Sequence, residues 1–214
     1  MWPTRRPTST DGRTPPAMGD WTSRRYIVID VEGNGQQPPD LVELATVPIV
    51  GGVIEEPSSW LVRPELPIAP LARKIHGITN EDVAAAPAFA DVRDEVLRAL
   101  NGAVLVAHNA HLDVGVLRRE LGDWASPEVL DTLKLSRRLL PGRPSYRLGS
   151  LAGEFKLADG LPDDLRPHRA MYDVLVTARL FVRLATPPGF RPRSMEELRG
   201  ELPGGSEGEA TTLF

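Results

Sequence analysis

The chain has 214 residues, enough for one domain with tails, and its 25 Lys and Arg against 29 Asp and Glu give a formal net charge of −4. This balance argues against a protein that holds duplex DNA mainly by its own positive charge, although metals bound to carboxylates would reverse the local sign. The absence of cysteine excludes disulfides and thiolate zinc sites.

The ends of the chain have a different composition from its middle. Residues 1–23 are mainly Pro, Thr, Ser, Arg and Gly with scattered apolar residues, so we expect a disordered N-terminal tail there. No apolar run follows Met1 as in a signal peptide, and no stretch approaches the roughly 18 apolar residues of a membrane span. We therefore expect a cytoplasmic protein with no membrane partner.

The first predicted strand lies in residues 25–33, where an apolar run ends in two carboxylates, Asp30 and Glu32, separated by Val31. Residues two apart on a strand point to the same face, with Cα atoms about 7 Å apart. At an effective dielectric constant of about 20, the two charges would repel each other by roughly 2 kcal/mol. Either the pair lies at a solvated strand end, or a cation, a base or a proton offsets the repulsion.

Two more antiparallel strands are predicted after a turn over residues 33–40. The second strand covers residues 41–50, where Pro48 predicts an edge or a bulge. Gly51-Gly52 indicates a hairpin that leads to a third strand ending near residue 62.

The middle of the chain alternates helices and strands. Thr79 to Asp82 has the form of a capping box, and a helix is predicted from Phe89 to Leu100, stopped by Asn101-Gly102. Residues 103–107 predict a buried parallel strand. A helix beginning at Leu112 places Asp113 in its first turn, near the positive end of the helix dipole.

The last third of the chain predicts a short strand at residues 129–131, a basic helix that stops at Pro141-Gly142, and a helix over residues 148–155. A final helix begins after Pro167 and carries Asp173 near its start. Residues 187–214 are rich in Pro, Gly and Glu, with a weak helical pattern at 195–198, and are expected to be a flexible tail. The predicted domain therefore covers residues 24–186 and has an α/β fold with a mixed sheet flanked by helices.

Chemistry-bearing residues collect at the ends of these elements. Each taken alone has an ordinary interpretation, as a helix-start charge, a solvated acid or a loop histidine. Four carboxylates and one imidazole together are sufficient to hold two hard divalent cations and to activate a water molecule. The residues are Asp30, Glu32, Asp113, Asp173 and His168.

Three motifs carry a resemblance to a known family. They are Asp30-Val31-Glu32, the stretch from Leu105 to Asp113, and the stretch from His168 to Asp173, supported by the segments at 75–79, 131–133 and 145–148. In order and spacing they resemble the motifs of DEDDh-type, DnaQ-like 3′-5′ exonucleases, which include the proofreading epsilon subunit of bacterial replicative DNA polymerase. The resemblance spans residues 25–185.

The resemblance implies an RNase H-like fold and a 3′-5′ exonuclease that releases nucleoside 5′-monophosphates from single-stranded 3′ ends, with DNA favoured over RNA. It implies that Asp30, Glu32, Asp113 and Asp173 bind two Mg²⁺ or Mn²⁺ ions and that His168 is the general base, a role that suits an imidazole at neutral pH. Five helical residues would turn His168 about 140° away from Asp173, so we expect His168 on a mobile loop. The alternatives are an exoribonuclease and a catalytically weak nucleic-acid-binding module.

The expected substrate contacts are Val31, Gly33, Asn34, His76 and Asn109. His76 would border the terminal nucleotide or serve a cap or turn, and His108 would pack beside its strand or, with Asn109, brace the site. His111 receives no role. Two departures from the family pattern, Gly33-Asn34-Gly35 for Thr-Thr-Gly and Leu112 for Phe, bear on the fit to the last nucleotide. The ending Thr212-Leu213-Phe214 resembles peptides that dock on sliding clamps but lacks their leading Gln, so an unstructured end is the alternative.

Overall fold

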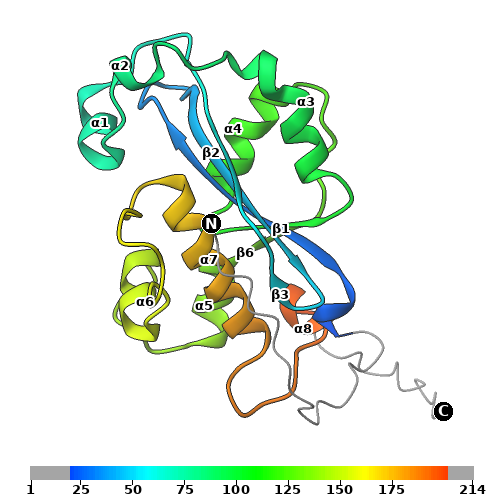
Figure 1. Ribbon diagram of the computed structural model, residues 1–214. Coiled ribbons are helices and arrows are strands. Elements are labelled where there is room, and N and C mark those ends of the chain that lie inside the picture. The colour runs from blue at the N-terminus through cyan, green and yellow to red at the C-terminus, as the bar shows by residue number, and fades with distance from the viewer. Residues whose placement is uncertain (1–19, 202–214) are drawn as a thin grey trace, which may run out of the picture.

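A six-stranded mixed sheet forms the centre of the protein (Figure 1); the computed structural model describes residues 20–201. The sheet order is β3-β2-β1-β5-β6, and β4 also pairs with β2. β2 is antiparallel to β1, β3 and β4, whereas β5 is parallel to β1 and β6. The strands are β1 (Arg25–Gly33), β2 (Leu41–Val50), β3 (Val53–Ile54), β4 (Ser58–Leu61), β5 (Val104–Ala107) and β6 (Val129–Asp131). The predicted mixed α/β sheet is confirmed.

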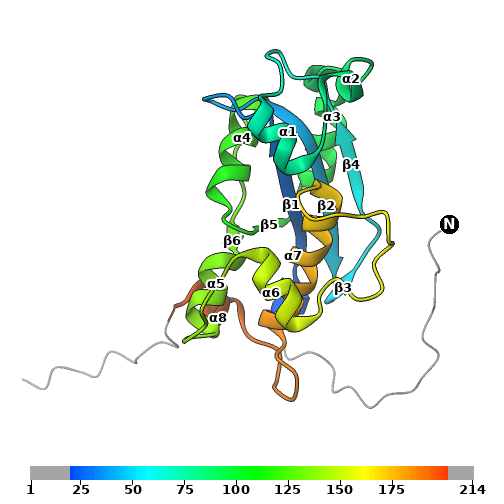
Figure 2. The same cartoon turned by 90° about the vertical axis from the view of Figure 1, so that its left-hand side faces the viewer.

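Helices cover both faces of the sheet. In Figure 1, α3 and α4 lie on one side of β1 and β2, and α5, α6 and α7 lie on the other. Figure 2 shows α1 and α2 beyond the end at which β1 finishes. The helices are α1 (Pro70–His76), α2 (Asn80–Val83), α3 (Phe89–Leu100), α4 (His111–Leu121), α5 (Thr132–Leu139), α6 (Leu148–Phe155), α7 (Ala170–Ala185) and α8 (Met195–Arg199), with a short 3₁₀ helix η1 (Trp21–Ser23).

The alternation of side chains along β1 divides the core in two. Tyr26 and Val28 pack in the core that contains α7, while Ile27 and Ile29 pack in the core that contains α3 and α4. Because strand residues two apart share a face, Asp30 and Glu32 continue the face of Tyr26 and Val28. The two carboxylates therefore emerge on the side of the sheet that α7 covers.

Three details differ from the sequence predictions. Pro48 does not break β2: the register with β1 is continuous there, and the bulge lies instead between Glu32 and Gly33. On its other side β2 pairs with β4 through Thr46 and with β3 from Ile49, so Pro48, which has no N–H to donate, lies between these two pairings. The predicted third strand is divided into β3 and β4, and α1 was not predicted.

The predicted domain boundaries at residues 24 and 186 lie inside the folded unit. Trp21 is 1% exposed and packs on Tyr26 and Phe181, and its Nε1–H donates to Thr186 Oγ1 over 2.8 Å. Met195 and Leu198 belong to the same core. The prediction of flexible tails is therefore wrong for residues 20–23 and 187–201. A few apolar side chains, spaced so that they reach the core, are sufficient to hold a polar segment against the domain.

Two further expectations concern other parts of the chain. The predicted clamp-binding end, Thr212-Leu213-Phe214, lies outside the described residues, as do residues 1–19. Within residues 20–201, every helix is too short or too polar to cross a membrane.

Candidate active site

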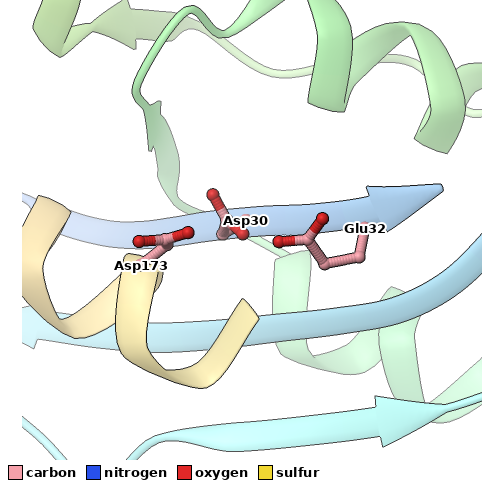
Figure 3. A group of neighbouring side chains, drawn as sticks. All are labelled: Asp30, Glu32 and Asp173. Atoms are coloured by element: carbon pink, nitrogen blue, oxygen red, sulfur yellow. The ribbon is translucent and has the colours of Figure 1, made fainter. Parts of the chain in front are cut away.

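Three of the predicted ligand carboxylates meet on one face of the sheet. Asp30 and Glu32 project from β1, and Asp173 projects from the first turn of α7 toward them (Figure 3). Each offers an oxygen within 4.8 Å of the oxygens of the other two. Packing of α7 on β1 thus joins the first and third motifs, which are more than a hundred residues apart in sequence.

Asp113 lies beside this cluster but is not one of its three members. Its side chain is buried in the first turn of α4, and Oδ1 accepts a hydrogen bond of 3.0 Å from the backbone N–H of Val31. That contact fixes the second motif against the first. The structure brings together three of the four predicted ligands and holds the fourth next to the strand between Asp30 and Glu32.

Burial makes these acids hard to ionise in the absence of a cation. It raises the pKa of Asp30 well above the usual range, and the charges of Asp113 and Asp173 add to the effect. Burial and then the charges of Asp173 and Glu43 raise the pKa of Glu32 to about 8. Burial also raises the pKa of Asp173 to about 6, opposed by the His168 backbone N–H. An oxygen-rich cluster whose acids retain protons fits a hard divalent cation, which would replace those protons.

His168 lies on an exposed turn directly before α7. Its backbone has φ +62°, the left-handed region that residues other than glycine rarely adopt. Its N–H donates to Asp173 Oδ2 over 3.0 Å. The backbone N–H of the predicted base therefore binds the carboxylate of the predicted ligand five residues later. The turn before α7 makes this contact possible, since in a continuous helix the two residues would point in different directions.

A cavity of about 660 Å³ opens beside the cluster and is lined by Asp30, Asp173 and His168. Arg137, Arg143 and Arg147 also line this cavity. Arg143 pairs with Glu154, while within residues 20–201 Arg137 and Arg147 make no ion pair. The cavity is thus lined by both acidic and cationic side chains.

His108 and Asn109 also line this cavity. The His108 ring nitrogens lie 3.0 Å from Thr132 Oγ1 and 3.0 Å from the Tyr146 carbonyl, and burial lowers the pKa of His108. Asn109 has φ +70°, and its N–H donates to Asp131 Oδ1. His108 therefore links the start of α5 to the segment around Tyr146.

The other expected substrate contacts have structural positions. Asn34 is fully buried: its amide nitrogen donates to Asp40 and Leu66, and Oδ1 accepts from two backbone N–H groups. The side chain of Asn34 is therefore not available to a substrate, which corrects the expectation that it is a substrate contact. Its hydrogen-bonding groups are instead used within the protein. Gly33 lies at the bulge, and the N–H of Val31 is used by Asp113.

His76 is buried at the end of α1, and Nδ1 accepts a 3.0 Å hydrogen bond from the Ile78 N–H. This contact matches the turn role that was left open for it. Burial lowers the pKa of His76, so the ring is neutral at pH 7 and carries its proton on Nε2. That Nε2 is buried without a hydrogen-bond partner among the described residues.

Sequence reasoning missed Glu43 and Arg169. Glu43 is a buried acid within the apolar strand Leu41-Val42-Glu43-Leu44-Ala45, and Arg169 forms an ion pair with it beside the cluster. The available signal was the presence of a glutamate in a strand that is otherwise apolar, since unpaired buried charges are rare.

Comparisons with known proteins agree with this geometry. The model of the RNase_T family, described as exonuclease, matches residues 27–181. Exodeoxyribonuclease 10 of Escherichia coli is 38% identical over 173 residues, covering 81% of this chain and 74% of that protein. The 3′-5′ exonuclease DinG of Bacillus subtilis is 36% identical over 168 residues, and the match covers 75% of this chain but only 18% of DinG.

A solved structure of exonuclease X in complex with 5′-overhanging duplex DNA has the same fold, with a TM-score of 0.66 and 36% identity over 81% of this chain and 98% of that chain. The matched region contains all three motifs and the cluster of carboxylates. Both the predicted family and the predicted enzyme class, a nuclease, are confirmed. The chain belongs to the exonuclease family.

Proposed function

We propose that the protein removes nucleotides one at a time from the 3′ ends of single-stranded DNA and releases nucleoside 5′-monophosphates. The observation that supports this function best is the joining of Asp30, Glu32 and Asp173, from two distant motifs, at the edge of an arginine-lined cavity. A cytoplasmic location is part of the same proposal and is compatible with a sequence that contains no cysteine.

The acids of the cluster would hold the metal. Asp30, Glu32 and Asp173 would be ligands, and Asp113, held beside them by its hydrogen bond to the Val31 N–H, would be a fourth. Two Mg²⁺ or Mn²⁺ ions, when bound, would supply the positive charge that the phosphodiester and the attacking water require. The acids would orient these ions. On binding them the acids would release their protons, and the positive charge of the ions would offset the free-energy cost of burying the ionised carboxylates.

His168 would act as the general base. It lines the same cavity as Asp30 and Asp173 and is exposed, so its ring can accept a proton from the attacking water and release it to solvent. The turn that carries it is held by its own N–H on Asp173. The base is therefore fixed relative to one of the ligands.

DNA is the favoured substrate. The exodeoxyribonuclease that is 38% identical supports this choice, as does the DNA complex of exonuclease X. Arg137 and Arg147, which line the cavity, would contact backbone phosphates and would supply local positive charge in a chain whose net charge is −4. His76, Asn109 and the backbone near Gly33 are proposed contacts to the terminal nucleotide.

The test is cleavage of a 5′-labelled single strand in the presence of Mg²⁺. The wild type should give a descending ladder, EDTA should stop it, and Asp30→Asn should abolish it. Asp123→Asn, which neutralises an exposed acid after α4, is the matched control and should leave the ladder unchanged. Absence of cleavage by the folded wild type, with strand binding retained, would show a binding module instead.

Substrate choice needs a separate comparison. Rates on DNA and RNA oligonucleotides of the same sequence, measured under the same conditions, should favour DNA. A faster rate on RNA would replace this part of the proposal by an exoribonuclease.

A further inference from the structure

Glu43 is a buried acid that the roles proposed above do not use. It lies in β2 directly opposite Glu32 in the β1–β2 register, and its side chain is 7% exposed. Side chains directly opposite on antiparallel strands share a face and lie close together. Glu43 therefore adds a further negative charge beside the metal cluster, which requires a physical reason.

Both oxygens of Glu43 are already occupied. Arg169 donates from Nη2 to Oε1 over 2.7 Å and from Nε to Oε2 over 3.0 Å, and the Ala170 N–H also donates to Oε2 over 2.9 Å. This two-point guanidinium–carboxylate geometry is among the strongest and most directional of charged contacts. Glu43 is therefore bound to the start of α7 rather than available as a ligand.

The groups that Glu43 binds immediately follow His168 in sequence. His168 has φ +62°, and a non-glycine residue keeps such a conformation only when its surroundings enforce it. On one side its N–H is bound to Asp173. On the other side the next two residues are bound to Glu43.

We propose that Glu43 and Arg169 form a clamp that holds the turn of His168 in the orientation needed for proton transfer. Both are positioning residues, since they act through His168, and this inference rests on the proposed role of His168 as the base. The clamp ties the turn to β2, the strand next to the one that carries Asp30 and Glu32.

The test combines kinetics and hydrogen exchange in Glu43→Gln, Arg169→Lys, His168→Ala and their pairwise combinations. Each clamp variant should lower kcat on single-stranded DNA by about 10- to 100-fold, since small misplacement of a reacting group has effects of this size, with KM changed far less. Glu43→Gln in the His168→Ala background should cause no further loss. In the metal-free proteins, amides of residues 166–172 should exchange faster than in the wild type.

Glu128 and Arg199 provide the matched control, because they form the same two-point pair, at 2.7 and 2.9 Å, away from the cluster. Glu128→Gln and Arg199→Lys should keep kcat and the exchange of residues 166–172. The clamp is refuted if Glu43→Gln slows the His168→Ala protein as much as it slows the wild type, or if both clamp variants keep kcat and exchange. Inactivity of the wild type would refute the proposed function instead, and the exchange data would still test the clamp.

Discussion

Asp30, Glu32 and Asp173 bring negative charge together where burial makes charge costly. Folding raises the pKa values of these acids. At a pH between the unfolded and the folded pKa of an acid, the chain takes up protons when it folds, so ionisation of the acids opposes folding. Residues chosen for stability alone would be apolar or hydroxyl-bearing. The cost is consistent with a site that a cation completes.

The metal-free protein should lose stability as the pH rises. The ordinary pKa values of Glu32 and Asp173, 4.5 and 3.8, increase to about 8 and about 6 on folding. Within this window the folded protein binds more protons than the unfolded chain, so the free energy of unfolding falls with increasing pH. Thermal unfolding in chelator should show a falling Tm between pH 5 and pH 8.

Two additions sharpen that experiment. Mg²⁺ should raise Tm more at pH 8 than at pH 5, because only deprotonated acids bind it. Asp30→Asn should raise the Tm of the metal-free protein at pH 8. A flat pH profile, or a lower Tm for Asp30→Asn, would contradict the electrostatic account.

His168→Ala should lower kcat by about 10²- to 10⁴-fold, the usual contribution of a general base. The side chain is exposed, so Tm should not change. His111→Ala is the control, since His111 is also exposed and lies at the start of α4. Steady-state kinetics at saturating metal would measure both, and a His168→Ala enzyme with wild-type kcat would remove the base from the mechanism.

The start of α7 and the end of β1 are the elements that build the site. The bulge after Glu32 lets the chain leave the sheet into the loop over residues 34–40, whose Asn34 carbonyl accepts the Ala69 N–H before α1. Gly35 makes this packing possible. It has φ +78°, and a Cβ there would lie 2.8 Å from the Ala72 Cβ.

Gly35→Ala should lower the free energy of unfolding by about 2 to 4 kcal/mol, the sum of backbone strain and overpacking against α1. Gly77→Ala provides the comparison, because Gly77 has φ +77° but no atom within 4 Å of its would-be Cβ. It should cost about 1 to 2 kcal/mol from strain alone. Urea unfolding of both variants measures the difference, and equal losses would mean that the contact with Ala72 is unimportant.

The sequence was informative where a pattern is local. The apolar residues before Asp30 predicted β1, and the apolar run before His108 predicted β5. In both segments the hydrophobic pattern and the β-favouring residue types indicate the same structure. α1 escaped prediction because it has only seven residues and no side-chain cap at Ala69. The ion pair between Glu43 and Arg169 could not be predicted, since it joins residues 126 apart through tertiary packing.

At the scale of the whole molecule, the folded domain includes segments that show little helical or strand periodicity in the sequence. Trp21 and α8 complete the core around α7, although the segments that carry them read as tails. A single tryptophan in a polar segment gives no periodicity from which to predict a buried residue. The three motifs, by contrast, were recognisable because their order and spacing resemble those of a known exonuclease family.

Trp21→Ala should lower the free energy of unfolding by about 3 to 5 kcal/mol, as expected for removing a buried aromatic side chain. Phe190→Ala, at a residue that is 76% exposed, should have little effect. A fragment of residues 24–186, which lacks Trp21 and α8, should be less stable than one of residues 20–201. Chemical denaturation of the four proteins measures this, and a fragment of full stability would restore the narrower boundaries.

The most direct test of the central claim is the identity and order of the products from one single-stranded DNA of mixed sequence. In a Mg²⁺ time course analysed by chromatography, we predict nucleoside 5′-monophosphates only, appearing in the order of the sequence from its 3′ end. Nucleoside 3′-monophosphates, oligonucleotide products, or an order that begins at the 5′ end would contradict the account.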